Sequence, residues 1–297
     1  MKPTHAPRGP GGDAPSRRGR PPAPICATAK PAHRAWLEPV RTRLVTSGLT
    51  LDALVSLSGY SKTRLSELLR GKGYYPGWEI TYSVIRALGL PVSPLLRLWA
   101  AAAAEADKDT DWIKSRIRDV QPLGREDQPV AHLALTQSMW KPYTAYARAF
   151  LQSERRARQV VSETFDILWL TWDVATATAD TTRHSWLLLR GKVLACAPKR
   201  PDGRPDLRAA AFSTAVQADI PDLAERLHRI DVLARFFDTI TRLPPDQMDV
   251  MVLRHLCGIP ETAVPGIVGL APAVTHTLDH HARGALNELC PDSDTQE

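Results

Sequence analysis

One short segment of the chain gathers side chains that could bind nucleic acid. Between residues 59 and 73, cationic and hydroxyl residues alternate with leucines at helical spacing. Lys and Arg can donate hydrogen bonds to guanine or to phosphate, and Ser and Thr can bond to either group. Lys72 follows the expected helix and suits a phosphate contact. The candidate DNA-binding residues are Ser61, Lys62, Thr63, Arg64, Ser66, Arg70 and Lys72.

The residues around this segment have the pattern of a helix-turn-helix. Thr50 is placed to cap a first short helix, and Ser61 is placed to cap a second one that runs to residue 70. Gly59 lies between them, where two helices at about 90–120° need a residue with positive φ. We therefore expect the cationic side chains on the outer face of the second helix. A plain helical hairpin with a solvated basic face is the alternative interpretation.

Glycines at short intervals divide residues 33–105 into five expected helices. This segment, with Pro76-Gly77-Trp78 after the third helix, resembles the actinobacterial form of the XRE, or lambda-repressor-like, family of helix-turn-helix regulators. The resemblance implies a five-helix domain whose third helix, residues 61–70, enters the major groove of DNA. Val55 stands where that family usually has alanine at the helix crossing.

A second helix-turn-helix is expected near the C-terminus, with Gly269 in the turn. Pro265 lies in its first helix and should kink or shorten it. Between residues 242 and 288, five acidic residues stand against three arginines, so this region forgoes much of the counterion release that drives DNA binding. The weaker candidate DNA-binding residues of its second helix are Thr275, His276, Thr277, His280 and Arg283.

The C-terminal half resembles a degenerate sigma-70 factor of the extracytoplasmic-function (ECF) type. Residues 146–190 carry an amphipathic pattern with Phe165, Trp169 and Trp172 on one side, and they are similar to sigma region 2. Residues 243–289 begin with Leu-Pro and are similar to sigma region 4. The resemblance implies contact with core RNA polymerase. Simple core packing is the alternative explanation of the aromatic stripe.

The expected fold class is all-α: a five-helix lambda-repressor-like domain followed by helical domains like sigma-70 regions 2 and 4. Residues 1–32 are rich in Pro, Gly and Arg and are expected to be a disordered basic tail. The expected ranges are 33–105 for the XRE-type domain, 106–138 for a linker, 139–200 for the region 2-like domain, 201–230 for a second linker, 231–291 for the region 4-like domain and 292–297 for a tail.

The formal net charge of +6 suggests a polyanionic partner without locating it. The residues before Ala35 hold seven Lys and Arg against one Asp, so this segment accounts for the whole net charge. The prediction that the partner is double-stranded DNA therefore depends on the helix-turn-helix and not on the net charge. Cys26, Cys196, Cys257 and Cys290 are far apart and form no CxxC pair, which argues against zinc or a disulfide framework.

Other classes of function find no support in the sequence. His276 and His280 are one helical turn apart but lack a third ligand, so we expect no metal. Walker A, GxGxxG, HExxH and GxSxG patterns are missing, and we expect neither an enzyme nor a cofactor. No apolar run is long enough to span a membrane and no secretory signal is evident, so we expect a cytoplasmic protein.

These observations favour a sequence-specific DNA-binding transcription regulator whose sigma-like half contacts RNA polymerase or forms a homodimer. Two alternatives stay open. The first alternative is a functional ECF-type sigma factor with an additional N-terminal DNA-binding domain. The second is an interaction protein that occupies polymerase without touching DNA.

Overall fold

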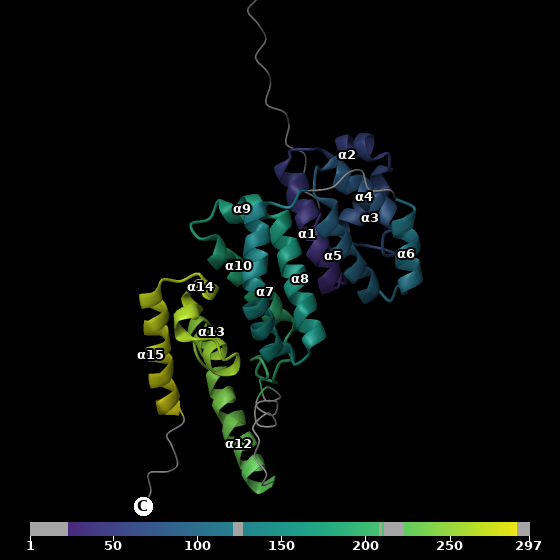
Figure 1. The fold of residues 1–297 in the computed structure, drawn as a ribbon. Coiled ribbons are helices and arrows are strands. Elements are labelled where there is room, and N and C mark those ends of the chain that lie inside the picture. Colours follow the sequence, from purple (N-terminus) through teal and green to yellow (C-terminus); the bar gives the residue numbers. More distant parts are fainter. Residues whose placement is uncertain (1–22, 121–126, 208–209, 211–222, 290–297) are drawn as a thin grey trace, which may run out of the picture. The chain divides into compact units, whose positions relative to one another are not determined.

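The computed structural model describes residues 23–120, 127–207, 210 and 223–289 (Figure 1). Every regular element in these ranges is a helix, which confirms the all-α class, and one isolated β-bridge joins Lys199 and Pro205. The chain forms two compact units. The first comprises the described residues of Met1–Val92 and Ala102–Gln121, and the second those of Ser93–Ala101 and Pro122–Glu297.

The first unit is built from short helices that end at glycines with positive φ. Gly48, Gly59, Gly71 and Gly89 all adopt the left-handed conformation, which glycine reaches without steric cost. Large buried side chains from successive helices, among them Trp36 and Trp78, form the core. The helices are α1 (Pro31–Thr46), α2 (Leu51–Ser58), α3 (Lys62–Arg70), α4 (Trp78–Ala87) and α6 (Thr110–Arg118), together with the ends of α5 (Val92–Glu105), whose residues Ser93–Ala101 belong to the second unit.

Helix α6 lies in the segment that we expected to be a linker. Asp109 caps it, because its carboxylate accepts a hydrogen bond of 2.7 Å from the Trp112 backbone N–H. Arg116 pairs with Glu79 of α4 at 3.3 Å, and α6 packs beside α4. The prediction of a linker was wrong here because it relied on the polar composition of the segment. One cap and a few aromatic and apolar side chains are enough to hold this helix.

The second unit contains longer helices and two irregular turns, a π-helical one (η1) and a 3-10 one (η2). Helices α7 and α12 begin within the ranges 106–138 and 201–230 that we expected to be linkers. The elements are α7 (Val130–Leu151), α8 (Glu154–Leu170), α9 (Trp172–Thr176), α10 (Thr181–Cys196), α12 (Leu223–Ile240), α13 (Pro245–Met251), η1 (Val252–Leu256), η2 (Glu261–Ala263), α14 (Val264–Val268) and α15 (Pro272–Leu289).

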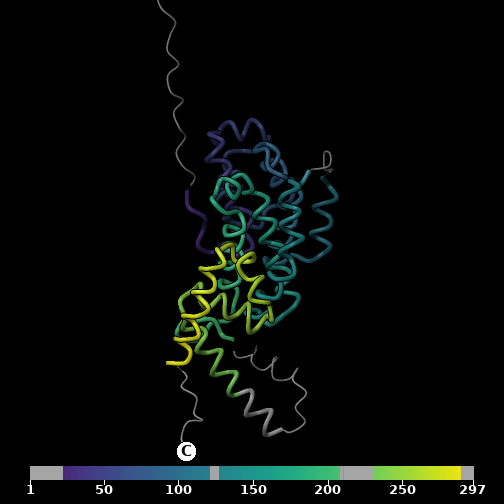
Figure 2. Tube along the Cα trace, turned by 60° about the vertical axis from the view of Figure 1, so that its left-hand side comes forward, coloured from purple at the N-terminus to yellow at the C-terminus, as the bar shows by residue number. Residues whose placement is uncertain are grey.

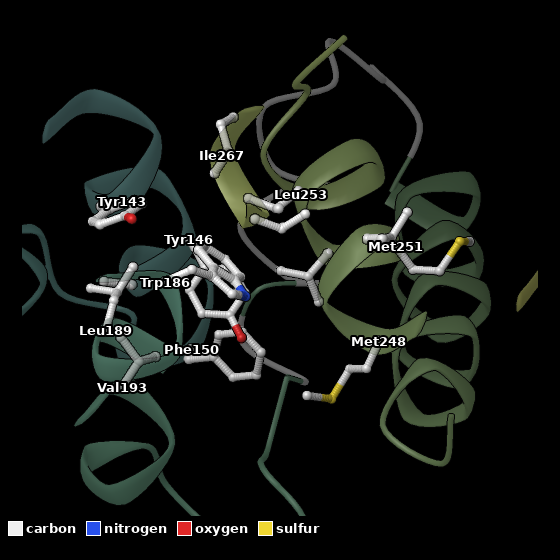
Figure 3. Packing of buried hydrophobic residues seen from close by; sticks show 14 of the residues in the cluster. Tyr143, Tyr146, Phe150, Trp186, Leu189, Val193, Met248, Met251, Leu253 and Ile267 are labelled. Carbon is white, nitrogen blue, oxygen red and sulfur yellow. The ribbon is translucent and has the colours of Figure 1, made fainter. Parts of the chain in front are cut away.

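One hydrophobic core joins the ranges 139–200 and 231–291 of the second unit. Figure 3 shows Tyr146 and Trp186, from α7 and α10, facing Met248 and Leu253, from α13 and η1. Helix α15 lies along α12 and α13 (Figure 2). The sequence suggested separate domains at 139–200 and 231–291, whereas the structure packs residues from both into a single cluster.

No helix in the described part of the chain combines the length and the apolar composition that a membrane span needs.

Candidate nucleic-acid interface

The turn between α2 and α3 has the geometry that its sequence predicts. Thr50 Oγ1 accepts a hydrogen bond of 3.1 Å from the Ala53 N–H and caps α2, and Ser61 Oγ accepts one of 3.4 Å from the Arg64 N–H and caps α3. Gly59 has φ of 76° and no atom lies near the position of a Cβ there. The left-handed glycine alone lets the chain turn sharply between the two helices.

Buried leucines and backbone hydrogen bonds fix the orientation of α3. Leu65, Leu68 and Leu69 are buried in the core of the first unit. The Arg41 guanidinium donates a hydrogen bond of 2.5 Å to the Leu69 carbonyl, and the Cys26 N–H donates one of 2.8 Å to the Arg70 carbonyl. The carbonyls at the end of α3 are therefore satisfied from outside the helix, which holds this end in place.

The outer face of α3 carries nearly all of the predicted DNA-binding residues. Ser66 is half-buried, and the remaining six are exposed: Ser61, Lys62, Thr63, Arg64, Arg70 and Lys72. Because the inner face is occupied by the leucines, these side chains project from one side of the helix. The structure thus brings the first set of candidates together on one accessible surface.

The charges on this surface are available to a ligand. Lys62 Nζ lies 2.7 Å from Asp52 of α2, but both side chains are exposed, so water and salt weaken this pair. Arg64, Arg70 and Lys72 form no ion pair with the described residues. Glu67 is the only acidic residue of α3. The surface is consequently cationic, as a phosphate-contacting helix requires.

A cavity of about 600 Å³ opens beside α3, and sequence reasoning missed it. Residues of α3, α4, α6 and the loop after α3 line it, including Arg64, Lys72, Tyr75 and Trp112. In the same loop Tyr74 is 97% exposed, the most exposed large hydrophobic side chain described. The consecutive tyrosines after Gly73 were a signal for this site, whereas Trp112 stood in an expected linker and gave none.

The second helix-turn-helix has the expected turn on a shortened first helix. Gly269 adopts φ of 65° between α14 and α15, the same role that Gly59 has between α2 and α3. Pro265 lies in the first turn of α14, where its missing N–H leaves no hydrogen bond unmade, and α14 has only five residues.

Helix α15 does not present Thr275 as we expected. Thr275 is buried, and its hydroxyl donates a hydrogen bond of 3.3 Å to the Ala271 carbonyl. With Asp279, Ala282 and Leu286 it forms an inward stripe at helical spacing. Thr275 therefore cannot reach DNA in this structure. The other candidates of this helix are exposed: His276, Thr277, His280 and Arg283.

Ion pairs within the chain occupy the charged groups near α15. The buried carboxylate of Asp279 pairs with both Arg254 and Arg283, the latter at 3.0 Å. Glu261 lies 3.0 Å from Arg254 and 3.2 Å from His276. Arg283 and His276 thus already have acidic partners, and the first helix-turn-helix has no comparable network among its described residues.

The turn of the second motif sits directly on α10. A Cβ at Gly269 would lie 2.3 Å from the backbone nitrogen of Arg183, in the first turn of α10. The Arg183 guanidinium donates a hydrogen bond of 3.3 Å to the Val268 carbonyl and pairs with Asp246 at 2.9 Å. A close backbone approach and a charged side chain together hold the second helix-turn-helix against α10.

A buried carboxylate reinforces the same junction. Asp249 of α13 accepts hydrogen bonds from the Tyr146 hydroxyl at 2.8 Å, from Trp186 Nε1 at 3.3 Å and from Arg190 Nε at 2.7 Å. Burial raises the pKa of Asp249 to about 6, since desolvation penalises the carboxylate more than Arg190 and the hydrogen bonds favour it. All four side chains belong to one polar network within the core.

No site for a metal emerges from the described residues: nowhere among them do three His, Cys, Asp or Glu side chains come together in a suitable group. Cys26, Cys196 and Cys257 are not joined by disulfides, and Cys290 lies outside the described residues.

Comparisons of the chain with protein-family models, with curated proteins and with solved structures found no significant match.

Proposed function

We propose that this chain is a sequence-specific DNA-binding transcription regulator that reads duplex DNA with α3. The observation that supports this function is the exposed cationic face of α3, held by buried leucines behind a glycine turn and free of strong internal ion pairs. Arg64 has the donor geometry to recognise guanine, and Lys72 suits phosphate. The resemblance of residues 33–105 to XRE-type regulators agrees with this assignment.

We propose further that the sigma-like half contacts RNA polymerase core or mediates homodimerisation. The engagement of Arg254 and Arg283 with Asp279, together with the burial of Thr275, leaves α15 few free groups for DNA. The charged groups near α15 are paired with one another within the chain. Such a helical module suits a protein partner better than promoter DNA.

Binding-site selection followed by gel shift tests the role of α3. Random-sequence DNA is enriched on the full-length protein, and the selected duplex is titrated with the wild type and with the double variant Lys62→Ala plus Arg64→Ala. We expect the double variant to bind the selected duplex at least about tenfold more weakly, because each base contact contributes about 1–3 kcal/mol of discrimination.

The matched control removes two other exposed cations of the same unit, in Lys114→Ala plus Arg118→Ala on α6. This pair changes the net charge equally and should retain the preference for the selected duplex. Specific binding that survives the double substitution in α3 would overturn the proposal.

Transcription in vitro with core polymerase separates the regulator from a functional ECF-type sigma factor. We expect the protein with core enzyme alone to start no promoter-dependent transcript. Specific initiation under these conditions would favour the sigma-factor alternative.

A further inference from the structure

Three kinds of side chain line the cavity beside α3. It measures about 600 Å³, within the usual range of small-molecule sites. Aromatic rings, cationic groups and carboxylates all contribute to its wall. Each of these chemistries recognises a different part of a nucleotide.

Aromatic side chains form one wall of the cavity. Tyr75 and Trp112 meet edge to face with ring centroids 6.4 Å apart, and the Arg116 guanidinium lies 5.7 Å from the centre of the Trp112 ring. Tyr60, in the turn between α2 and α3, also lines the cavity. Lys108 Nζ also lies 5.4 Å from the centre of the Trp112 ring, so a base that stacks on Trp112 must displace one of the two cations from the ring.

Some of the cationic groups that line the cavity already form ion pairs with described residues, and others do not. Arg116 pairs with Glu79 at 3.3 Å, which neutralises one charge of each sign. Arg64 and Lys72 line the cavity and have no ion-pair partner among the residues described. Two unengaged cations at one cavity suit a phosphate group. Glu67, the remaining carboxylate, can accept hydrogen bonds from ribose hydroxyls.

We propose that this cavity binds a nucleoside monophosphate, with the base on the Trp112 wall, the phosphate at Arg64 and Lys72, and the ribose at Glu67. Because Arg64 and Lys72 also belong to the DNA-binding face, a bound nucleotide withdraws them from DNA. The nucleotide is then a small-molecule effector that releases the protein from its operator, and DNA weakens nucleotide binding to the same degree. The regulatory part of this proposal rests on the proposed function of α3.

Calorimetry on the full-length protein without DNA tests the site, with AMP as the probe. We expect AMP to bind at one site, and adenosine and ribose 5-phosphate to bind at least about tenfold more weakly, since each lacks one of the recognised parts. Trp112→Ala should weaken AMP binding about tenfold or more, in keeping with the loss of one base-stacking contact. Trp140→Ala, at a partly exposed tryptophan of α7 outside the cavity, is the matched control and should leave AMP affinity unchanged.

Fluorescence anisotropy of the selected duplex tests the coupling. AMP should weaken duplex binding by the wild type and by Trp140→Ala but not by Trp112→Ala, whose retained duplex binding also shows that the first unit is folded. A single-stranded oligonucleotide serves as a further arm, because a nucleotide within a strand has the same chemistry as free AMP.

The outcomes distinguish this inference from the proposed function. A protein that binds its selected duplex but gives no heat with AMP overturns the nucleotide site and leaves the regulator intact. Tight binding of the single strand without binding of AMP overturns the effector role. AMP binding that depends on Trp112 in a protein without a preferred duplex supports the nucleotide site and overturns the function proposed for α3.

Discussion

The predicted DNA-binding residues of α3 differ in what else they do in the fold. Ser61 already caps the helix with its hydroxyl, and Lys62 lies against Asp52. The side chains of Arg64, Arg70 and Lys72 neither cap a helix nor form an ion pair with the described residues. Removing Ser61 would therefore disturb α3 itself, whereas removing Arg64 alters the cationic face and the cavity wall but leaves the helix cap in place. This is why the Arg64 side chain is the more informative one to substitute.

Asp249 predicts how the stability of the second unit depends on pH. Its pKa rises from about 3.9 in an unfolded chain to about 6 in the fold, so between these values the folded state binds a proton that the unfolded state has released. Its contribution to the free energy of unfolding is thus largest below about pH 4 and declines as the pH rises through 6. The shift corresponds to about 3 kcal/mol.

Urea unfolding of the full-length protein from pH 4 to pH 7 measures this contribution. The stability of the wild type minus that of Asp249→Asn should fall across this interval, since other titrating groups cancel in the difference. Asp173→Asn, at an exposed carboxylate of α9, is the control. A difference that rises with pH would show that pairing with Arg190 outweighs desolvation.

The two helix-turn-helix elements share a turn conformation but not an environment. Gly59 and Gly269 have φ of 76° and 65°. Space around the Cβ position of Gly59 is open, whereas Gly269 lies against the backbone of Arg183. The first motif is consequently free at its turn, and the second is seated on α10.

This contrast predicts unequal costs for the same substitution. Gly59→Ala should lower the free energy of unfolding by about 1 kcal/mol, the strain of a left-handed alanine. Gly269→Ala adds a collision 2.3 Å from the Arg183 nitrogen and should cost about 3 kcal/mol. Thermal unfolding followed by circular dichroism measures both.

Gly191→Ala is the control for these two variants. Gly191 lies within α10 with ordinary helical φ and open space at its Cβ position, so alanine there should stabilise the protein by about 0.5–1 kcal/mol. Equal losses at Gly59 and Gly269 would contradict the close seating of the second turn.

At the scale of the whole molecule, the positive charge is divided unevenly. Residues 1–22 contain five Lys and Arg and one Asp, although the whole chain has a formal charge of only +6. The cationic face of α3 therefore lies in the remaining 275 residues, whose formal net charge is only +2 (+6 minus +4). Under the proposed function, specific recognition belongs to α3 and general attraction to phosphate belongs to residues 1–22.

Removing residues 1–22 should consequently weaken binding to unrelated duplexes more than it alters the preference for the selected one. The slope of log affinity against log salt concentration should become shallower by up to about four, because each lost phosphate contact changes it by about 0.9. Gel shifts at several salt concentrations measure both quantities. An unchanged slope would show that this segment does not contact DNA.

Local sequence patterns were sufficient to predict the all-α class, the caps Thr50 and Ser61, and the left-handed turns at Gly59 and Gly269. It also predicted that the cationic residues of α3 face outward. These features depend on residues within a few positions of one another, because a cap needs only an oxygen near the next turn and a positive φ needs only a missing Cβ. A single stretch of sequence contains all of that information.

Packing between segments far apart in the sequence determines which side chains are buried between them, and this packing is visible only in the folded structure. Thr275 faces inward, α6 lines a cavity beside α3, and residues from the ranges 139–200 and 231–291 share one core. Tyr146 and Asp249 form a hydrogen bond although 103 positions separate them in the chain. No local spacing encodes such a contact, because it depends on where packing of the apolar faces leaves each helix.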